Sequence, residues 1–177
     1  MLSDSHGKSY YIEQVLSRLN VRPRAVLFLG DGLRDLSVIQ ARWPDVLVWA
    51  VAGNCDASLV FPPDEPTERV LPIEGRTVLM MHGHTHGVRY GIEDAVRYAA
   101  ELRADVLLFG HTHLPCERTL LAGTVVGRDA QGKDIVLSKP LIVANPGSIG
   151  QPRDGGTPSF GVLTIRDGAI LFSHGRL

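Results

Sequence analysis

Aspartate, asparagine and histidine recur in this sequence directly after short apolar runs. Asp4 and His6 follow the first run, Asp31 follows the second and Asn54 follows the third. The fourth and fifth runs are followed by histidines, namely His82, His84, His111 and His113. A mixture of imidazole and carboxylate ligands suits Mn, Fe, Zn, Co or Ni better than Ca, which prefers an all-oxygen shell. The residue types therefore predict a site for divalent metal ions.

These residues lie far apart in sequence, so the elements before them must bring them together. In open α/β sheets the carboxyl ends of parallel strands converge on one crevice. Each motif alone has a simpler interpretation, because an aspartate after a strand often caps a helix and pairs such as Gly30-Asp31 are common in turns. Histidine is a poor cap and a poor turn former, so five such motifs in succession favour one shared site.

Two divalent ions side by side would suit phosphoester chemistry. Ions roughly 3.5–4 Å apart can hold a bridging hydroxide and bind the phosphate oxygens, which stabilises the entering and the leaving oxygen of an in-line displacement. A shared carboxylate must separate the two cations, and Asp31 is the natural candidate. We therefore predict a phosphoesterase with a dinuclear metal site.

The spacing of apolar residues predicts an α/β fold. Continuous apolar runs are typical of strands that are buried on both faces, and they occupy residues 25–29, 46–51, 77–81 and 106–109. Apolar residues at helical spacing predict amphipathic helices over residues 11–19, 36–43 and 92–102. Strand and helix are therefore expected to alternate as far as residue 110.

Beyond residue 110 the pattern indicates β-structure. Pairs of apolar segments flank turn-rich residues, which predicts two hairpins that pair residues 120–126 with 135–137 and residues 160–165 with 169–173. We expect a β-meander here, within a mixed sheet or two stacked sheets with helices outside. No linker or internal repeat divides the chain, so we expect a single domain over residues 1–177.

The first apolar run is short. Only Met1, Leu2 and Ser3 precede Asp4, whereas each other run has at least four apolar residues. We expect a first strand that is cut short, by a misplaced start or by truncation. Asp4 and His6 would then lie close to a terminus that can fray.

Composition and charge argue against several kinds of partner. Hydrophobic residues make up 44% of the 177 and charged residues 21%, as in ordinary globular proteins. The net charge of −1, with both signs interspersed, gives no basic stripe for extended nucleic acid. No apolar run approaches the roughly 20 residues that span a bilayer, so we expect no membrane contact and a cytoplasmic location. Cys55 and Cys116 are then expected to be reduced rather than paired.

The motifs carrying these residues, in their order along the chain, resemble the signature of the calcineurin-like metallophosphoesterases. They are Asp4-x-His6, Gly30-Asp31, Gly53-Asn54-x-Asp56, His82-Gly-His84 and Gly110-His111-x-His113. Asn145-Pro-Gly-Ser148 and Pro152-Arg153 are similar to the tail of the small bacterial and archaeal phosphodiesterases of the YfcE type. The resemblance runs from residue 3 to about residue 165. It implies the metallophosphoesterase fold, a two-sheet mixed β-sandwich flanked by helices.

The resemblance also implies ligands for two divalent metal ions, with manganese as the first choice and iron, zinc, nickel and cobalt as alternatives. Asp31 would bridge the ions. The remaining ligands would be Asp4, His6 and His113 for one ion and Asn54, His82 and His111 for the other. His84 would face the substrate, and the alternative for it is a solvated loop histidine.

The candidate catalytic residues are Asn54, Cys55, Asp56 and His84. At the position of Cys55 many members of the family have a histidine that is thought to protonate the leaving oxygen or to stabilise the transition state. YfcE-type members resemble this chain in lacking that histidine. A thiol is a poor acid, so we expect a preference for phosphodiesters or for esters whose leaving group needs little protonation. A small residue that only fills space is the alternative for Cys55.

Two other functions stay open at this point. The retromer subunit related to this family uses the fold as a protein-binding scaffold with a compromised metal site, whereas the ligand set here is complete. A phosphomonoesterase is the nearest alternative among enzymes. Arg153 could bind the phosphate of a small phosphoester substrate, or it could be a solvated loop arginine. The resemblance further suggests a homodimer or a larger assembly.

Overall fold

The computed structural model describes residues 1–56, 65–153 and 155–177. Its helices are α1 (Ser9–Arg18), η1 (Leu33–Leu36), α2 (Ser37–Arg42), η2 (His84–His86) and α3 (Glu93–Glu101), where η marks a 3-10 helix. Its strands are β1 (Ala25–Phe28), β2 (Leu47–Ala50), β3 (Glu68–Ile73), β4 (Arg76–Met81), β5 (Val106–Phe109), β6 (Pro115–Leu120), β7 (Val125–Arg128), β8 (Asp134–Val136), β9 (Leu141–Pro146), β10 (Ser159–Arg166) and β11 (Ala169–Arg176).

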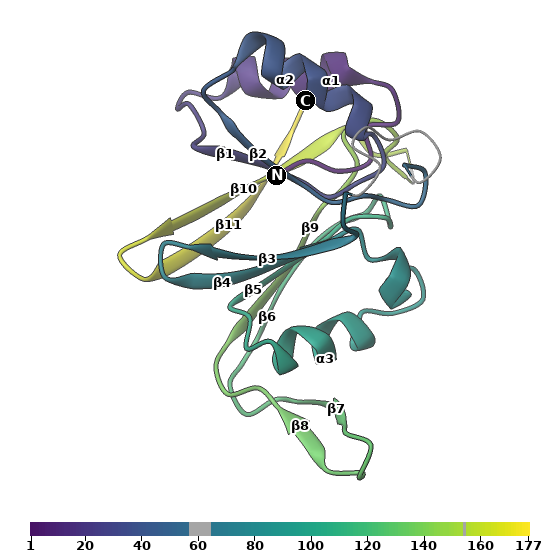
Figure 1. Ribbon diagram of the computed structural model, residues 1–177, viewed down its shortest axis with the longest axis vertical. Helices are drawn as coiled ribbons and strands as arrows, with labels where there is room; N and C mark the ends of the chain where they lie inside the picture. Colours follow the sequence, from purple (N-terminus) through teal and green to yellow (C-terminus); the bar gives the residue numbers. More distant parts are fainter. Residues whose placement is uncertain (57–64, 154) are drawn as a thin grey trace.

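All strands except the separate hairpin β7-β8 form two layers, with α1 and α2 outside one layer and α3 outside the other (Figure 1). One layer is a five-stranded mixed sheet in the order β3-β4-β5-β9-β6. The other contains the parallel pair β1-β2 and the hairpin β10-β11. The first residues run between these pairs, because the Leu2 N–H donates to the Leu27 carbonyl (2.9 Å) and the Gly161 N–H to the Met1 carbonyl (3.0 Å). The predicted two-sheet mixed sandwich flanked by helices is confirmed.

Apolar residues at the predicted spacing hold these layers together. Residues of both sheets, such as Leu29 and Met80, are fully buried between the layers. Ile12 of α1 and Ile39 of α2 pack against β1, and Ala95 of α3 packs on the outer face of the five-stranded sheet. Full burial of a leucine or isoleucine side chain contributes about 1.5–3 kcal/mol. This packing fixes both sheets against each other, so their strand ends are rigid supports.

The parallel strands direct their carboxyl ends toward the same region. β1 runs parallel to β2, and β5 runs parallel to both β4 and β9. The residues that follow these strands are the ones singled out by the sequence motifs. The architecture therefore brings motifs from the whole chain to one edge of the sandwich.

The structure differs from the expected element order in two places. β3 was not predicted, because Pro72 interrupts its apolar residues, and the strand pairs antiparallel with β4 at the edge of the sheet, where proline is tolerated. Strand and helix therefore do not alternate throughout the first 110 residues. The expected β-meander is also wrong, since β9 lies between β5 and β6 and runs parallel to β5. β9 takes this place because its apolar residues suit the buried centre of a sheet.

The predicted hairpins are present, with one shift in their bounds. β10 and β11 pair as expected over the predicted segments. β7 pairs with β8, but Leu120 ends β6 and belongs to the main sheet instead of the hairpin. None of the helices among the described residues is long and apolar enough to cross a membrane.

A buried carboxylate fastens β4 to β5 and gives a testable stability effect. Asp105 is 5% exposed and accepts hydrogen bonds from the Thr77 N–H (2.8 Å) and from Arg76 (3.3 Å), with Lys139 Nζ 2.7 Å away. Burial opposes its ionisation, but the contacts with Lys139 and Thr77 outweigh burial and hold the pKa of Asp105 below its ordinary 3.8. A carboxylate with a lowered folded-state pKa stabilises the fold above its unfolded-state pKa.

We expect Asp105→Asn to lower the free energy of unfolding at pH 7 by about 1–3 kcal/mol. The difference from wild type should shrink as the pH falls below 3.8, the ordinary value, because the carboxyl becomes neutral first in the unfolded state and then, at its lower pKa, in the folded state. Urea denaturation at several pH values measures this difference, with the exposed Asp134→Asn as control. A difference that stays constant down to pH 3 would contradict the assignment.

Candidate metal centre

Strained backbone is concentrated at the strand ends that carry the predicted ligands. Five of these ligands have positive φ angles, which are unusual for residues other than glycine, namely Asp4 (57°), His6 (46°), Asp31 (59°), His111 (65°) and His113 (62°). Among the described non-glycine residues only Glu74, Arg103 and Asp167 share this conformation. Such a conformation costs about 1–3 kcal/mol per residue and persists where the surrounding fold imposes it. The fold therefore holds these side chains in fixed directions.

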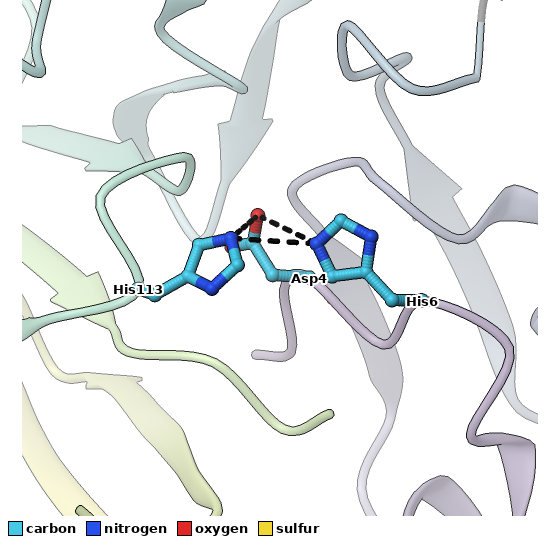
Figure 2. A group of neighbouring side chains, drawn as sticks. All are labelled: Asp4, His6 and His113. Atoms are coloured by element: carbon cyan, nitrogen blue, oxygen red, sulfur yellow. Dashed lines mark hydrogen bonds and ion pairs between the residues drawn. The ribbon is translucent and has the colours of Figure 1, made fainter. Parts of the chain in front are cut away.

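Asp4, His6 and His113 point toward one another at one side of this edge (Figure 2). His113 Nε2 lies 3.2 Å from Asp4 Oδ1 and 3.3 Å from His6 Nε2. Two ligands bound about 2.1 Å from one ion are separated by about 3.0–3.4 Å, so these distances suit a shared ion. Asp4 Oδ1 is buried and has no hydrogen-bond partner within the described part of the chain. The Asp4 carboxylate raises the pKa of His113, although burial opposes this.

Asp31 lies between this cluster and a second one. Its Oδ2 atom is 3.8 Å from His6 Nε2 and 3.6 Å from His82 Nε2. Its Oδ1 atom accepts a hydrogen bond from the Cys55 N–H at 2.8 Å. One oxygen of Asp31 therefore faces both groups, which is the position that a bridging ligand must occupy.

The second cluster contains Asn54, His82 and His111. His82 Nε2 lies 3.2 Å from Asn54 Oδ1, and the rings of His82 and His111 are 5.1 Å apart between centroids. Burial lowers the pKa of His111, and the neighbouring His82 lowers it further. The imidazole of His111 is therefore kept neutral, which is the form that binds metal ions.

Backbone carbonyls orient two of the imidazole rings. His82 Nδ1 lies 2.6 Å from the Leu29 carbonyl oxygen, and His113 Nδ1 lies 2.6 Å from that of Gln151. A carbonyl can only accept, so each Nδ1 must carry the proton and donate it. The Nε2 lone pairs then face the clusters, which is the arrangement typical of histidines that bind metal ions.

The burial of the carboxylates supports a bound cation. Asp4 is fully buried and Asp31 is 2% exposed, and burial of an unpaired carboxylate costs several kcal/mol. Among the described residues these two carboxylates contact histidines and no lysine or arginine in an ion pair. Carboxylate, amide and imidazole donors in this arrangement fit divalent metal ions, which would supply the missing positive charge.

The carboxylate of Asp56, a residue expected to act on the substrate, binds backbone N–H groups instead. Its Oδ2 atom accepts hydrogen bonds from the backbone N–H groups of Asp31 (2.7 Å) and Gly53 (2.9 Å). Its Oδ1 atom accepts from those of Gly32 (2.9 Å) and Leu33 (3.0 Å). The carboxylate is thus fully used in joining two loops, so the structure makes Asp56 a positioning residue.

Asp35 is a supporting residue that was not predicted from the sequence. Its Oδ2 atom accepts hydrogen bonds from the Ser5 hydroxyl (2.5 Å) and the Gly7 N–H (2.9 Å). These bonds fix the backbone on both sides of His6. An aspartate near a helix start is common, so nothing in its spacing distinguished Asp35 from an ordinary helix residue.

The tail motif supports the site from the other side. The Asn145 amide donates to the Gly110 carbonyl at 2.9 Å, and the Ser148 hydroxyl donates to the Asp4 carbonyl at 2.8 Å. Ser148 also accepts from the Gln151 N–H at 2.7 Å, next to the carbonyl that orients His113. In the sequence this motif stands out by resemblance only, whereas in the structure its hydrogen bonds position the ligand loops.

Two further predicted residues lie beside the clusters. The ring of His84 is 5.3 Å from that of His82, and its Nδ1 atom is buried without a partner among the described residues. Cys55 Sγ, a free thiol like that of Cys116, lies within 4.8 Å of ligand atoms of His6 and Asp31. Burial and the Asp31 carboxylate raise the pKa of Cys55 to about 11, so the thiol stays protonated at neutral pH.

Comparison with known proteins gives consistent matches over most of the chain. The family model described as the calcineurin-like phosphoesterase superfamily domain matches residues 1–168. The chain is 31% identical over 170 residues to the probable metallophosphoesterase YsnB of Bacillus subtilis, covering 96% of this chain and 85% of YsnB. It is 31% identical over 121 residues to the phosphodiesterase YfcE of Escherichia coli, covering 66% of this chain and 52% of YfcE.

Solved structures share the same architecture. A predicted phosphoesterase from Streptococcus pneumoniae TIGR4 is 25% identical, with a TM-score of 0.71 and coverage of 99% of this chain and 86% of the other. Vacuolar Protein Sorting 29 from Cryptosporidium parvum is 18% identical, with a TM-score of 0.60 and coverage of 99% and 95%. The second likeness concerns the fold alone.

Proposed function

Because the chain belongs to the calcineurin-like phosphoesterase superfamily, we propose that it hydrolyses phosphodiesters of small molecules with two divalent metal ions at the clustered ligands. Membership of the family supports a phosphoester hydrolase that uses divalent metal ions. The position of Asp31 Oδ2, 3.8 Å from His6 Nε2 and 3.6 Å from His82 Nε2, supports two ions rather than one. Likeness to YfcE, a phosphodiesterase by name, supports the ester type.

The chain's own residues divide the work in this proposal. When bound, the metal ions would supply an activated water and positive charge for the phosphate oxygens. Asp31 would set their separation, and the carbonyls of Leu29 and Gln151 keep the imidazoles of His82 and His113 turned inward. The Nδ1 atom of His84, which has no partner among the described residues, could donate a hydrogen bond to a phosphate oxygen when it is protonated. Manganese is the first metal to test. Iron, zinc, nickel and cobalt should be tested as well, since the donor set does not distinguish manganese from them.

A comparison of two esters tests this function. We expect the protein to cleave bis-p-nitrophenyl phosphate faster than p-nitrophenyl phosphate in the presence of Mn²⁺. EDTA should stop the reaction, and added Mn²⁺ should restore it. A faster monoester reaction would favour the phosphomonoesterase. Tight metal binding without hydrolysis of either ester would favour a protein-binding scaffold, the second function open to this fold.

Replacement of the Cys55 thiol, which lies beside the candidate metal centre, should change the ester preference. Cys55→His places a group with a pKa near neutrality where a protonated thiol now lies, and general acid catalysis contributes about 10²–10⁴-fold. We expect turnover of phenyl phosphate, a monoester with a basic leaving group, to rise about 10-fold or more relative to that of bis-p-nitrophenyl phosphate. Steady-state kinetics measure the ratio, with Cys55→Ser as the matched control. Equal ratios in the two variants would show that Cys55 only fills space.

A further inference from the structure

A groove of about 390 Å³ adjoins the candidate metal centre. It is lined by residues 88–92, which follow η2, and by Phe109, His111, Thr112, Leu114 and Cys116. His111, a proposed metal ligand, and Arg153 of the tail both line it. The groove therefore leads away from the place where the phosphate would bind.

The groove is apolar at its base and aromatic at its rim. Val88 and Phe109 are buried, with 4% and 2% of their surfaces exposed. Leu114 is 43% exposed and Tyr90 is 95% exposed, so both present apolar surface to a bound molecule. These two side chains beside the candidate metal centre could hold a flat ring, because rings stack on tyrosine and pack on leucine.

The charge at the groove is positive. Arg89 and Arg153 both line it and are exposed, and neither forms an ion pair with an acidic side chain in the part of the chain that the structure describes. No aspartate or glutamate lines the groove among the described residues. Arginine suits both phosphate oxygens and the faces of heteroaromatic rings. The groove therefore combines anion binding with ring binding.

We infer that this groove binds the nucleoside part of the substrate, so that the protein acts on small nucleoside phosphodiesters; this inference rests on the proposed phosphodiesterase function. The base would stack on Tyr90, with the phosphate toward His111. A volume of about 390 Å³ falls at the small end of pockets for small molecules, about 300–1,000 Å³, and suits one nucleoside rather than a peptide. A glycerol or choline substituent would leave the aromatic rim without a partner.

The test compares two diesters that both have alkoxide leaving groups. We expect kcat/KM of the metal-loaded protein to be higher for thymidylyl-thymidine than for glycerophosphoglycerol. Tyr90→Ala should lower kcat/KM for the dinucleoside about 10-fold, since one stacked base contributes about 1–3 kcal/mol, and should lower it much less for the glycerol diester. Tyr90→Phe should keep the preference. Tyr10→Ala, at a tyrosine 49% exposed on α1, is the matched control.

Calorimetric titration with thymidine 5′-monophosphate and glycerol 3-phosphate separates binding from hydrolysis. Equal kcat/KM of wild type and Tyr90→Ala for thymidylyl-thymidine would overturn the groove assignment and leave the proposed function standing. If neither diester is cleaved, the proposed function fails, and the calorimetric binding measurement then tests the groove assignment. Weaker binding of thymidine 5′-monophosphate to Tyr90→Ala would then support the groove, and equal binding would overturn it. Because Tyr90 is 95% exposed, the variant should fold normally.

Discussion

Asp31→Asn is expected to lower kcat/KM for bis-p-nitrophenyl phosphate by at least about 100-fold, since loss of residues that only support metal ligands already costs about 10–100-fold. Asparagine has the size of aspartate and can still accept the hydrogen bond that Cys55 N–H donates to Oδ1. It lacks the negative charge on the oxygen that faces both His6 and His82. The variant therefore tests Asp31 as the proposed shared ligand without disturbing the fold. Steady-state kinetics and the metal content after dialysis measure the effect.

The stability of Asp31→Asn supplies an independent control. The buried carboxylates of Asp4 and Asp31 lie together without a lysine or arginine partner among the described residues, so the metal-free variant should be at least as stable as metal-free wild type. An ion at 100 times its dissociation constant stabilises by about 2.7 kcal/mol. The rise of Tm on addition of Mn²⁺ should be much smaller in the variant. Wild-type metal content with wild-type turnover would exclude Asp31 as the bridge.

The fold was predictable where one kind of residue dominates a segment. Val106–Phe109 is a continuous apolar run, and it forms the buried strand β5 without any shift. β3 was missed because Pro72 and charged residues conceal its pairing, which depends on a neighbouring strand rather than on local pattern. The place of β9 between β5 and β6 was missed for the same reason. Sequence spacing reports burial, whereas the order of strands depends on contacts between distant segments.

The candidate site was predictable to a different extent. The proposed ligands follow strands, so their convergence could be inferred from the topology of an α/β sheet, and the structure brings them to one edge. Supporting residues such as Asp35 and the groove residue Tyr90 had no such signal, because they act through loops whose path the sequence does not reveal. Asp56 had a signal that was ambiguous, since a carboxylate two residues after a ligand can face either the substrate or the backbone.

Asp56→Asn is expected to lower the free energy of unfolding of the metal-free protein by about 2–5 kcal/mol. Asp56 is 6% exposed, and its two oxygens together accept four backbone N–H groups. In either orientation the asparagine amide nitrogen would face two of these donors, and each buried donor left without an acceptor costs about 1–3 kcal/mol. Urea denaturation measures the loss, with the exposed Asp134→Asn as the matched control.

The same variant separates a positioning role from a catalytic one. The loops of Asp31 and Asn54 are both held by Asp56, because its carboxylate joins the N–H of Asp31 to that of Gly53. A positioning residue should therefore affect metal affinity, and we expect a 10–100-fold weaker Mn²⁺ affinity with an unchanged ratio of diester to monoester turnover once the protein is saturated with metal. Normal stability and normal metal affinity with a reduced kcat would instead place Asp56 in direct contact with the reacting ester.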